Sequence, residues 1–152
     1  MPYWQLYYHI VWATKYRQPV LDLTAEPIIH NYIRTKAIGL GATVFAINGW
    51  VDHVHIIASV PPKIALSTFI GQIKAVSSMK FNRNYSAEIP IYWQDEYSVF
   101  SLDKKRLPYY VRYVDQQKEH HRQKTEIGAL ERIDGESNQK VLEPSGEYNA
   151  DY

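Results

Sequence analysis

Strand-like and helix-like segments follow one another along this chain in an order that only a few folds accommodate. Segments rich in β-branched and aromatic residues predict four strands, at residues 3–13, 42–50, 51–60 and 91–101. Segments with apolar residues at helical spacing predict three helices, at about residues 24–39, 65–85 and 107–124. The order β-α-β-β-α-β, followed by α, is that of the ferredoxin-like or split βαβ pattern. We therefore predict an α+β domain with an antiparallel sheet, helices packed on one face, and a further C-terminal helix.

Short local signals define some of the boundaries between these segments. Thr24 is a candidate N-cap of the first helix, and Gly39 and Gly41 would end that helix. The dipeptide Asn48-Gly49 stands between the second and third predicted strands. Because Asn-Gly is a favoured sequence for tight hairpin turns, we expect these two strands to form a hairpin around it.

Charge is distributed unevenly over the 152 residues, whose net charge is +1. Residues 1–126 hold 15 Lys and Arg against 10 Asp and Glu, a balance of +5, and residues 127–152 hold 2 against 6, a balance of −4. We predict one folded domain at 1–126 and an acidic, flexible tail at 127–152. The mildly basic body suits contacts with phosphate groups.

Features that the sequence lacks narrow the classes of function. There is no cysteine, which leaves out a disulfide framework and a thiolate site. No run of about 18 apolar residues predicts a membrane span, and the N-terminus does not follow the pattern of a signal peptide. We expect a cytoplasmic protein that binds neither a membrane nor a small-molecule cofactor.

The third predicted strand carries the sequence Asp52-His53-Val54-His55. Side chains alternate along a strand, so His53 and His55 should share one face, roughly 6–7 Å apart at the backbone. Two neutral imidazoles at this spacing can converge on one transition-metal cation. The alternative is a pair of histidines on a half-solvated strand face.

The last predicted helix carries Tyr113 and Gln117, which lie on one helix face because they are four residues apart. His120 and His121 continue this face. The alternative is an ordinary solvent-exposed face. If this helix lies near the two histidines, a cation there would keep open positions for an amide oxygen and a phosphate. A phenol has a pKa near 10, so a tyrosine nucleophile would need such help near pH 7.

The chain resembles the single-tyrosine HUH transposases of bacterial insertion sequences and their REP-associated relatives. The stretches that carry the resemblance, in order along the chain, are Tyr8–Arg17, Asp52–Ile57 with Pro61-Pro62, Leu66-Ser67 with Ile73–Ser78, Trp93–Ser101, and Tyr113–Gln117 with His120-His121. The combination of the His-Val-His strand, the Lys-Tyr-Arg turn and the Tyr-x-x-x-Gln helix is far more specific than any of the three alone.

The resemblance implies an activity and its residues. His53, His55 and Gln117 would bind Mg²⁺ or Mn²⁺, and Tyr113 would be the nucleophile that cuts and rejoins single-stranded DNA through a 5′-phosphotyrosine. Family members recognise DNA hairpins near the ends of the element and are homodimers. Tyr109 and Tyr110 have the right residue type, but only Tyr113 stands four residues before Gln117.

Other residues have supporting interpretations. His9 is interpreted as structural, or as a DNA contact, rather than as a ligand, because a lone strand histidine seldom binds metal. The candidate phosphate contacts are Lys15, Arg17, Lys74, Lys104 and Lys105, with scattered solubilising charge as the alternative.

Three other functions remain open from the sequence. They are an HUH nickase for replication or conjugation, a catalytically idle nucleic-acid-binding protein derived from a transposase, and a metal-dependent hydrolase that uses water as its nucleophile. A covalent protein–DNA intermediate would separate the proposed enzyme from the last two.

Overall fold

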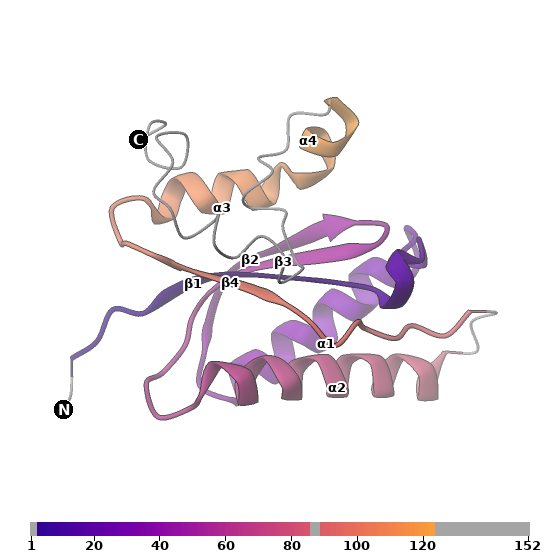
Figure 1. Cartoon of the computed structure of the whole chain (residues 1–152), viewed down its shortest axis with the longest axis horizontal. Coiled ribbons are helices and arrows are strands. Elements are labelled where there is room, and N and C mark those ends of the chain that lie inside the picture. The colour runs from indigo at the N-terminus through magenta and orange to yellow at the C-terminus, as the bar shows by residue number, and fades with distance from the viewer. Residues whose placement is uncertain (1–2, 86–88, 124–152) are drawn as a thin grey trace.

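A computed structural model of the chain describes residues 3–85 and 89–123 (Figure 1). Its elements are β1 (Tyr7–Ala13), the short 3₁₀ helix η1 (Lys15–Arg17), α1 (Ala25–Gly39), β2 (Thr43–Trp50), β3 (His53–Ser59), α2 (Leu66–Asn84), β4 (Ser98–Leu102), α3 (Leu107–Asp115) and α4 (Gln117–Gln123). The predicted tail at 127–152 lies outside the described residues. In the described part of the chain, no helix combines the length and the apolar character needed to cross a bilayer.

The strands form one antiparallel sheet in the order β2-β3-β1-β4. Because β3 lies between β1 and β2, helix α1 connects two parallel strands that a third strand separates. Helix α2 likewise connects the parallel strands β3 and β4, and β1 lies between them. This is the split βαβ arrangement, and the predicted α+β fold is confirmed.

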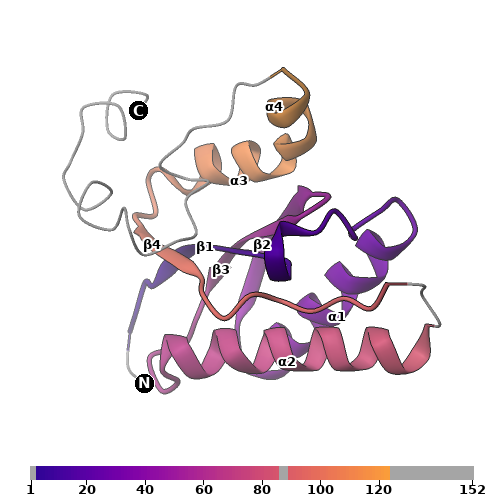
Figure 2. The same ribbon diagram turned by 45° about the vertical axis from the view of Figure 1, so that its right-hand side comes forward.

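The two faces of the sheet carry different helices. Helices α1 and α2 lie on one side of the sheet, and α3 and α4 lie on the other (Figures 1 and 2). Ile10 and Trp12 of β1 and Ile56 of β3 belong to the core under α1 and α2. Ile57, the next residue of β3, packs with α3 instead. Neighbouring side chains of a strand point to opposite faces. Alternate residues of each strand therefore belong either to the core under α1 and α2 or to the face that α3 and α4 cover.

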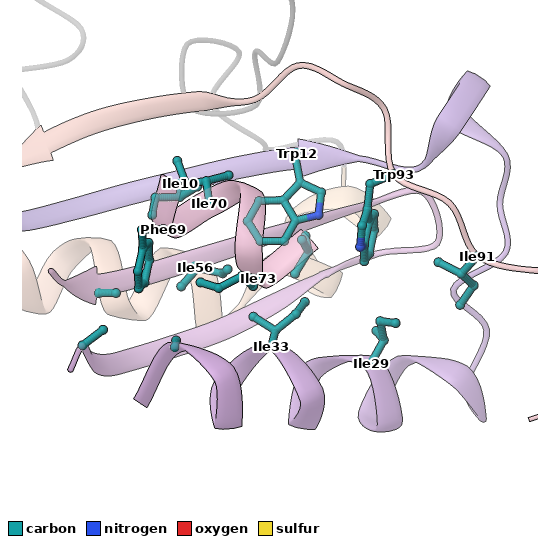
Figure 3. Close-up of a cluster of buried hydrophobic side chains, with 14 of the residues drawn as sticks. Ile10, Trp12, Ile29, Ile33, Ile56, Phe69, Ile70, Ile73, Ile91 and Trp93 are labelled. Atoms are coloured by element: carbon teal, nitrogen blue, oxygen red, sulfur yellow. The ribbon is translucent and has the colours of Figure 1, made fainter. Parts of the chain in front are cut away.

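The core under α1 and α2 is built around two tryptophans (Figure 3). The ring of Trp12 is fully buried and meets Trp93 edge to face, with centroids 5.7 Å apart and an angle of 84° between the planes. Trp93 Nε1 donates a hydrogen bond of 3.0 Å to Ser77 Oγ on α2, which satisfies its polar atom. These contacts attach the segment before β4 to α2.

The predicted strand at 91–101 is wrong over its first half, because β4 begins only at Ser98. Residues 91–97 instead follow α2, with one isolated bridge between Trp93 and Thr14. Asn82 bonds both the N–H and the C=O of Ile91, each at 2.9 Å. A side chain of α2 thus takes the backbone groups that a neighbouring strand would otherwise use. The first predicted strand is also shorter than expected, since β1 starts at Tyr7.

The predicted hairpin turn at Asn48-Gly49 is also wrong, because both residues lie inside β2 and the turn falls at residues 51 and 52. Gly49 lies opposite Val54 in the register. A Cβ atom at Gly49 would lie 2.2 Å from the carbonyl oxygen of His53. The glycine is therefore needed for close approach of two backbones, not for a turn.

Two predictions about helices need correction. Thr24 does not cap α1, since its backbone is helical and its side chain makes no capping bond. Asp22 Oδ1 takes this role by accepting from the N–H groups of Thr24 and Ala25, at 3.0 and 2.8 Å. The predicted helix at 107–124 is divided at Gln116 into α3 and α4. The last carbonyl of α3, on Asp115, accepts a hydrogen bond of 3.0 Å from Asn48 Nδ2 of β2.

Partly buried His30 on α1 is expected to make stability depend on pH. Burial and the positive charges of Lys118 and Arg34 lower the pKa of His30 from 6.5 to about 4. The unfolded chain therefore binds this proton at higher pH than the folded chain. The free energy of unfolding therefore keeps its full value above pH 6.5. It decreases by at most about 3 kcal/mol as the pH falls to about 4. Urea unfolding between pH 7.5 and 4 should show a flatter profile for His30→Gln than for the unmodified chain. Two parallel profiles would contradict the assignment.

Candidate active site

His53 and His55 lie on one face of β3, as their spacing predicted. Their ring centroids are 5.1 Å apart, and the rings are nearly perpendicular at 71°. The face is the one that α3 and α4 cover, opposite the core of α1 and α2 (Figure 2). Both residues are buried, at 3% and 0% exposure. The strand therefore presents two imidazoles to a covered space between the sheet and the last two helices.

Each of these rings is held through its Nδ1 atom. Asp52 Oδ1 lies 2.7 Å from His53 Nδ1, and His9 Nε2 lies 2.8 Å from His55 Nδ1. A carboxylate oxygen can only accept, so neutral His53 carries its proton on Nδ1 and has its lone pair on Nε2. A partner that fixes the tautomer and the orientation of an imidazole is the usual second shell of a metal-binding histidine. His9 is fully buried, which agrees with its structural interpretation.

Asp52 also joins the basic turn to this site. Its Oδ2 lies 3.7 Å from Arg17 Nη1. Burial raises the pKa of Asp52, but the hydrogen bond to His53, together with the positive charges of protonated His53, of Arg17 and of protonated His121, outweighs burial and lowers the pKa below 3.8. Asp52 is thus a carboxylate at neutral pH, as an acceptor for His53 requires.

Helix α3 places Tyr113 over the histidines. Its ring centroid lies 6.3 Å from that of His55, at an angle of 74°. Only 3% of Tyr113 is exposed, and its neighbours in the second core include Ile57 and Val114. The competing Tyr110 is 1% exposed and lies 6.4 Å from His9, one ring further from the His53–His55 pair. Tyr113 thus lies beside a predicted ligand, His55.

Gln117, the first residue of α4, is fully buried where α3 gives way to α4. This junction is tied to β2 through Asn48, which bonds Asp115 as described above and accepts from Lys118 Nζ at 2.7 Å. Asn48 is the cross-strand neighbour of His55. The fold therefore brings the helix end that bears Gln117 to the strand position beside His55. Lys118 also forms a 2.6 Å ion pair with Glu26 of α1, and the sequence predicted neither of its two contacts.

His121 is a site residue whose contact the sequence did not predict. Its Nε2 lies 3.1 Å from His53 Nε2, and its ring stacks on Trp50 with centroids 5.2 Å apart. The only sequence signal is that His121 stands one further helical step of four residues after Gln117. Trp50 and His53 are paired across β2 and β3, so α4 packs directly on the strand end that carries the site.

The candidate phosphate contacts fall into two groups. Lys15, Arg17 and Lys74 lie near the C-terminal end of β1, where Lys15 and Lys74 line one cavity of about 430 Å³. Lys104 and Lys105 are exposed beyond β4, at the opposite end of the sheet, since Leu102 pairs with Tyr7. The candidate phosphate contacts are therefore spread over two ends of the molecule.

Lys74 already has partners within the protein. Its Nζ donates to the carbonyl oxygens of Gln94, Asp95 and Glu96, at 2.6, 3.2 and 3.3 Å. Burial lowers the pKa of Lys74, although the charge of Asp95 acts in the opposite direction. The side chain helps to hold the segment before β4 on α2, and its contact with DNA stays a prediction.

His53, His55 and Gln117 are the residues that could hold a divalent cation. The Nδ1 atoms of both imidazoles face positioning partners, so a cation would be held through Nε2, which in His53 lies 3.1 Å from His121 Nε2. Among residues 3–85 and 89–123, no three His, Asp, Glu or Cys side chains are gathered as a metal site. The predicted third ligand is of another kind, a buried amide. The donor set of imidazole nitrogens and one neutral oxygen suits a divalent cation with open positions.

The sequence of the chain is similar to those of known transposases. The sequence model of the family described as "Transposase IS200 like" matches residues 2–117, from before β1 to the first residue of α4. The transposase for insertion sequence element IS200 of Salmonella typhimurium is 29% identical over 76 residues, which are 50% of this chain and 50% of that protein. The chain spans about half the length of the curated relatives it matches.

Solved structures share the fold. A protein described as a candidate transposase from Deinococcus radiodurans superposes with a TM-score of 0.61 at 24% identity, covering 77% of this chain and 95% of that one. A REP-associated tyrosine transposase bound to a REP hairpin superposes with a TM-score of 0.60 at 16% identity, covering 80% of this chain and 74% of that one. At these identities the likeness shows the fold alone.

Proposed function

Because the chain belongs to the family of IS200-like transposases, we propose that it cleaves and rejoins single-stranded DNA with Tyr113 as the nucleophile. The observation that carries the proposal is the position of Tyr113, with its ring 6.3 Å from that of His55 and on the same side of the sheet as His53. A phenol beside two positioned imidazoles is the arrangement that metal-assisted attack on a phosphate needs.

The proposed step exchanges one phosphate ester for another. The Tyr113 oxygen forms a bond to phosphorus, and the bond from phosphorus to the 3′ oxygen of the preceding nucleotide breaks. The proton that the phenol loses is balanced by the proton that the released 3′ oxygen gains. The product is a 5′-phosphotyrosine on the downstream strand and a free 3′-hydroxyl on the upstream strand. Because the ester retains the energy of the broken bond, a second 3′-hydroxyl can reverse the step and join a new strand without ATP.

Divalent metal is part of the proposal. Mg²⁺ or Mn²⁺ held by His53, His55 and Gln117 would polarise the phosphate and offset the charge that develops on it. The protein's own contribution is orientation. Asp52 and His9 fix the two rings, and the packing of α3 fixes the phenol.

Access of a phosphate to Tyr113 requires movement of the groups that cover it. With 3% of the residue exposed, a phosphate cannot reach the phenol in the described conformation. The ion pair between Lys118 and Glu26 and the bond between Lys118 and Asn48 hold α4 on α1 and β2. We propose that DNA binding moves the groups that cover the phenol while Tyr113 and Gln117 stay beside His55.

The remaining parts of the proposal concern partners. A structural neighbour was solved with a REP hairpin, which supports recognition of hairpin-marked single-stranded DNA by this chain. Lys15 and Arg17, exposed at the end of β1, are the proposed phosphate contacts nearest to the site. We also propose a homodimer and a cytoplasmic location, both of which rest on the family.

The test is a covalent trapping assay. The protein, Mn²⁺ and hairpin-containing single-stranded DNA from the flanks of its own gene are mixed and resolved on denaturing gels. With a 3′-end label, a protein-sized band should carry the radioactivity, and with a 5′-end label, a shortened free strand should appear. Cleavage without any adduct would favour the hydrolase with a water nucleophile. Binding without cleavage on every flanking hairpin would favour the idle nucleic-acid-binding protein.

Asp52→Asn is expected to weaken metal binding while the fold persists. An amide can still face His53, but it loses the charge that holds the proton on Nδ1, and loss of such a partner typically lowers metal affinity about 10- to 100-fold. Titration of Mn²⁺ by electron paramagnetic resonance measures this directly. Asp103→Asn is the matched control, because Asp103 is exposed at the far end of the sheet and pairs with Arg106. Equal Mn²⁺ affinity in the two variants would remove Asp52 from the site.

A further inference from the structure

The turn after β1 has a backbone that its sequence does not favour. Tyr16 has φ 58° and ψ 22°, and Arg17 has φ 55°. This left-handed region is unfavourable for residues with a Cβ atom and is the normal place for glycine. Two consecutive side-chain-bearing residues there, one of them aromatic, mark a strained segment. Such strain persists where the surrounding structure enforces it, and it concentrates at functional sites.

The surrounding contacts fix the turn firmly. The N–H of Thr14 donates to the carbonyl of Asp52 at 2.8 Å, and the N–H of Lys15 donates to the carbonyl of Tyr92 at 2.8 Å. Thr14 Oγ1 donates to the carbonyl of Gln18 at 2.7 Å, which closes the turn from the other side. The left-handed conformation is therefore held by the sheet, by the β2–β3 turn and by the segment before β4.

The Tyr16 ring gains little from this arrangement within the protein. It is 83% exposed, and no residue of the turn is buried. The ring lies beside Lys15, whose Nζ is 5.6 Å from the ring centroid. Folding energy alone gives no reason to keep an aromatic residue in a strained, exposed position where glycine would relax the backbone.

The turn is connected directly to the candidate active site. Arg17 Nη1 lies 3.7 Å from Asp52 Oδ2, and Asp52 Oδ1 lies 2.7 Å from His53 Nδ1. A strand of DNA whose phosphate reaches the histidines thus passes close to this turn. Lys15 and Arg17 flank Tyr16 with positive charge. An aromatic ring between two cations is the combination with which proteins hold single strands, the cations on the phosphates and the ring on a base.

We propose that Tyr16 is a stacking platform for one unpaired base of the DNA strand that enters the active site, with Lys15 and Arg17 on the neighbouring phosphates. The ligand is an unpaired nucleobase within single-stranded DNA. The proposal rests on the proposed function for the nature of the strand, and it adds a binding site that the catalytic residues do not supply. The strained backbone aims the ring outward, where a base can cover it.

The test uses substitutions that separate stacking from strain. The probe is a 20-nucleotide oligothymidine with 2-aminopurine at every fourth position, whose fluorescence falls when the analogue stacks on an aromatic ring. Tyr16→Phe should quench the probe and bind it like the unmodified protein. Tyr16→Gly should bind about tenfold more weakly, which is within the range for one stacked base, and should lose most of the quenching. Tyr3→Ala is the control, because Tyr3 is 85% exposed at the other end of β1.

The thermal stability of Tyr16→Gly is a second measurement, and we expect it to increase while the affinity for the probe decreases. Because a glycine in place of Tyr16 would adopt the left-handed backbone without a steric penalty, Tyr16→Gly should raise Tm by about 3 °C while it weakens binding. A Tyr16→Gly protein that binds the probe as well as the unmodified protein would overturn the proposal, whatever its Tm. A similar loss of affinity for the fully paired duplex of the same strand would also overturn it, because a paired base cannot cover the ring.

The outcome is independent of the cleavage assay. Loss of quenching in Tyr16→Gly, in a protein that forms no covalent adduct, would support the stacking site and contradict the transposase chemistry. Adduct formation with unchanged quenching in Tyr16→Gly would support the chemistry and remove the stacking site.

Discussion

Tyr113→Phe is expected to abolish the covalent protein–DNA adduct and to lower the rate of strand cleavage by at least about a thousandfold, as removal of a catalytic nucleophile does. The substitution removes one oxygen atom and leaves the ring that packs with Ile57 and Val114. Fold stability should change by about 1 kcal/mol, the size of one hydrogen bond. Single-strand DNA binding should be retained, because the proposed phosphate contacts lie on the turn after β1. Single-turnover cleavage on denaturing gels and equilibrium binding measure the two effects separately.

Tyr109→Phe is the matched control for this experiment. Tyr109 sits on the same helix, four residues before Tyr113, and its ring lies 5.5 Å from that of Tyr110. Its cleavage rate should stay within a few-fold of the unmodified protein. If Tyr113→Phe cleaves at the normal rate, the nucleophile is water or another tyrosine. An adduct that persists in Tyr113→Phe and disappears in Tyr109→Phe would reassign the role.

Gly49→Ala is expected to destabilise the fold strongly, although it adds only one methyl group to the sheet. The new Cβ would lie 2.2 Å from the carbonyl oxygen of His53 and 3.0 Å from the Cα of Val54, so two backbones must separate. Overpacking against backbone commonly costs about 1–3 kcal/mol, and we expect the upper end here because no flexible side chain can yield. The same shift would move His53, so Mn²⁺ binding should weaken together with stability. Urea unfolding and Mn²⁺ titration on one preparation test both parts.

Gly71→Ala provides the opposite expectation with the same chemical change. Gly71 lies within α2, and a Cβ there would meet nothing within 4 Å. Alanine should stabilise this helix position by about 0.5–1 kcal/mol, because glycine is the poorer helix former. A Gly49→Ala protein as stable as the unmodified chain would show that the β2–β3 turn can shift freely. That result would remove close backbone approach as the reason for the glycine.

Several features of the candidate site follow from short stretches of sequence. Alternation along a strand places His53 and His55 on one face. The four-residue step predicted one helix face for Tyr113 and Gln117, but the helix divides at Gln116, so the two residues belong to α3 and α4. The order of the segments leads to the split βαβ sheet, since few topologies connect these elements without crossing. The inferences about the two histidines and about the sheet succeed because each depends on a local period or on chain order, and neither requires knowledge of a distant partner.

The contacts that assemble the site could not be predicted in this way. Asn48 looked like a turn residue, yet it bonds Asp115, 67 positions away, at the point where the last helix divides. Asp22 rather than Thr24 caps α1, because local geometry and not residue type alone selects the cap. Asn48 and Asp22 are both residue types that can form a hydrogen bond within a local turn or with a more distant group. The tertiary fold determines which of these groups lies within hydrogen-bonding distance.

The sequence likewise identifies candidate site residues but not the contacts that these residues make. The types and the spacing of His53, His55, Tyr113 and Gln117 follow from the sequence, as does the division of each strand between two faces. The tertiary structure was needed to find that His9 and Asp52 hold the two rings, that His121 meets His53 over Trp50, and that Lys74 bonds the backbone before β4. These contacts join elements far apart in the chain. Hydrogen bonding and packing at such distances depend on three-dimensional proximity, which periodicity along a sequence does not encode.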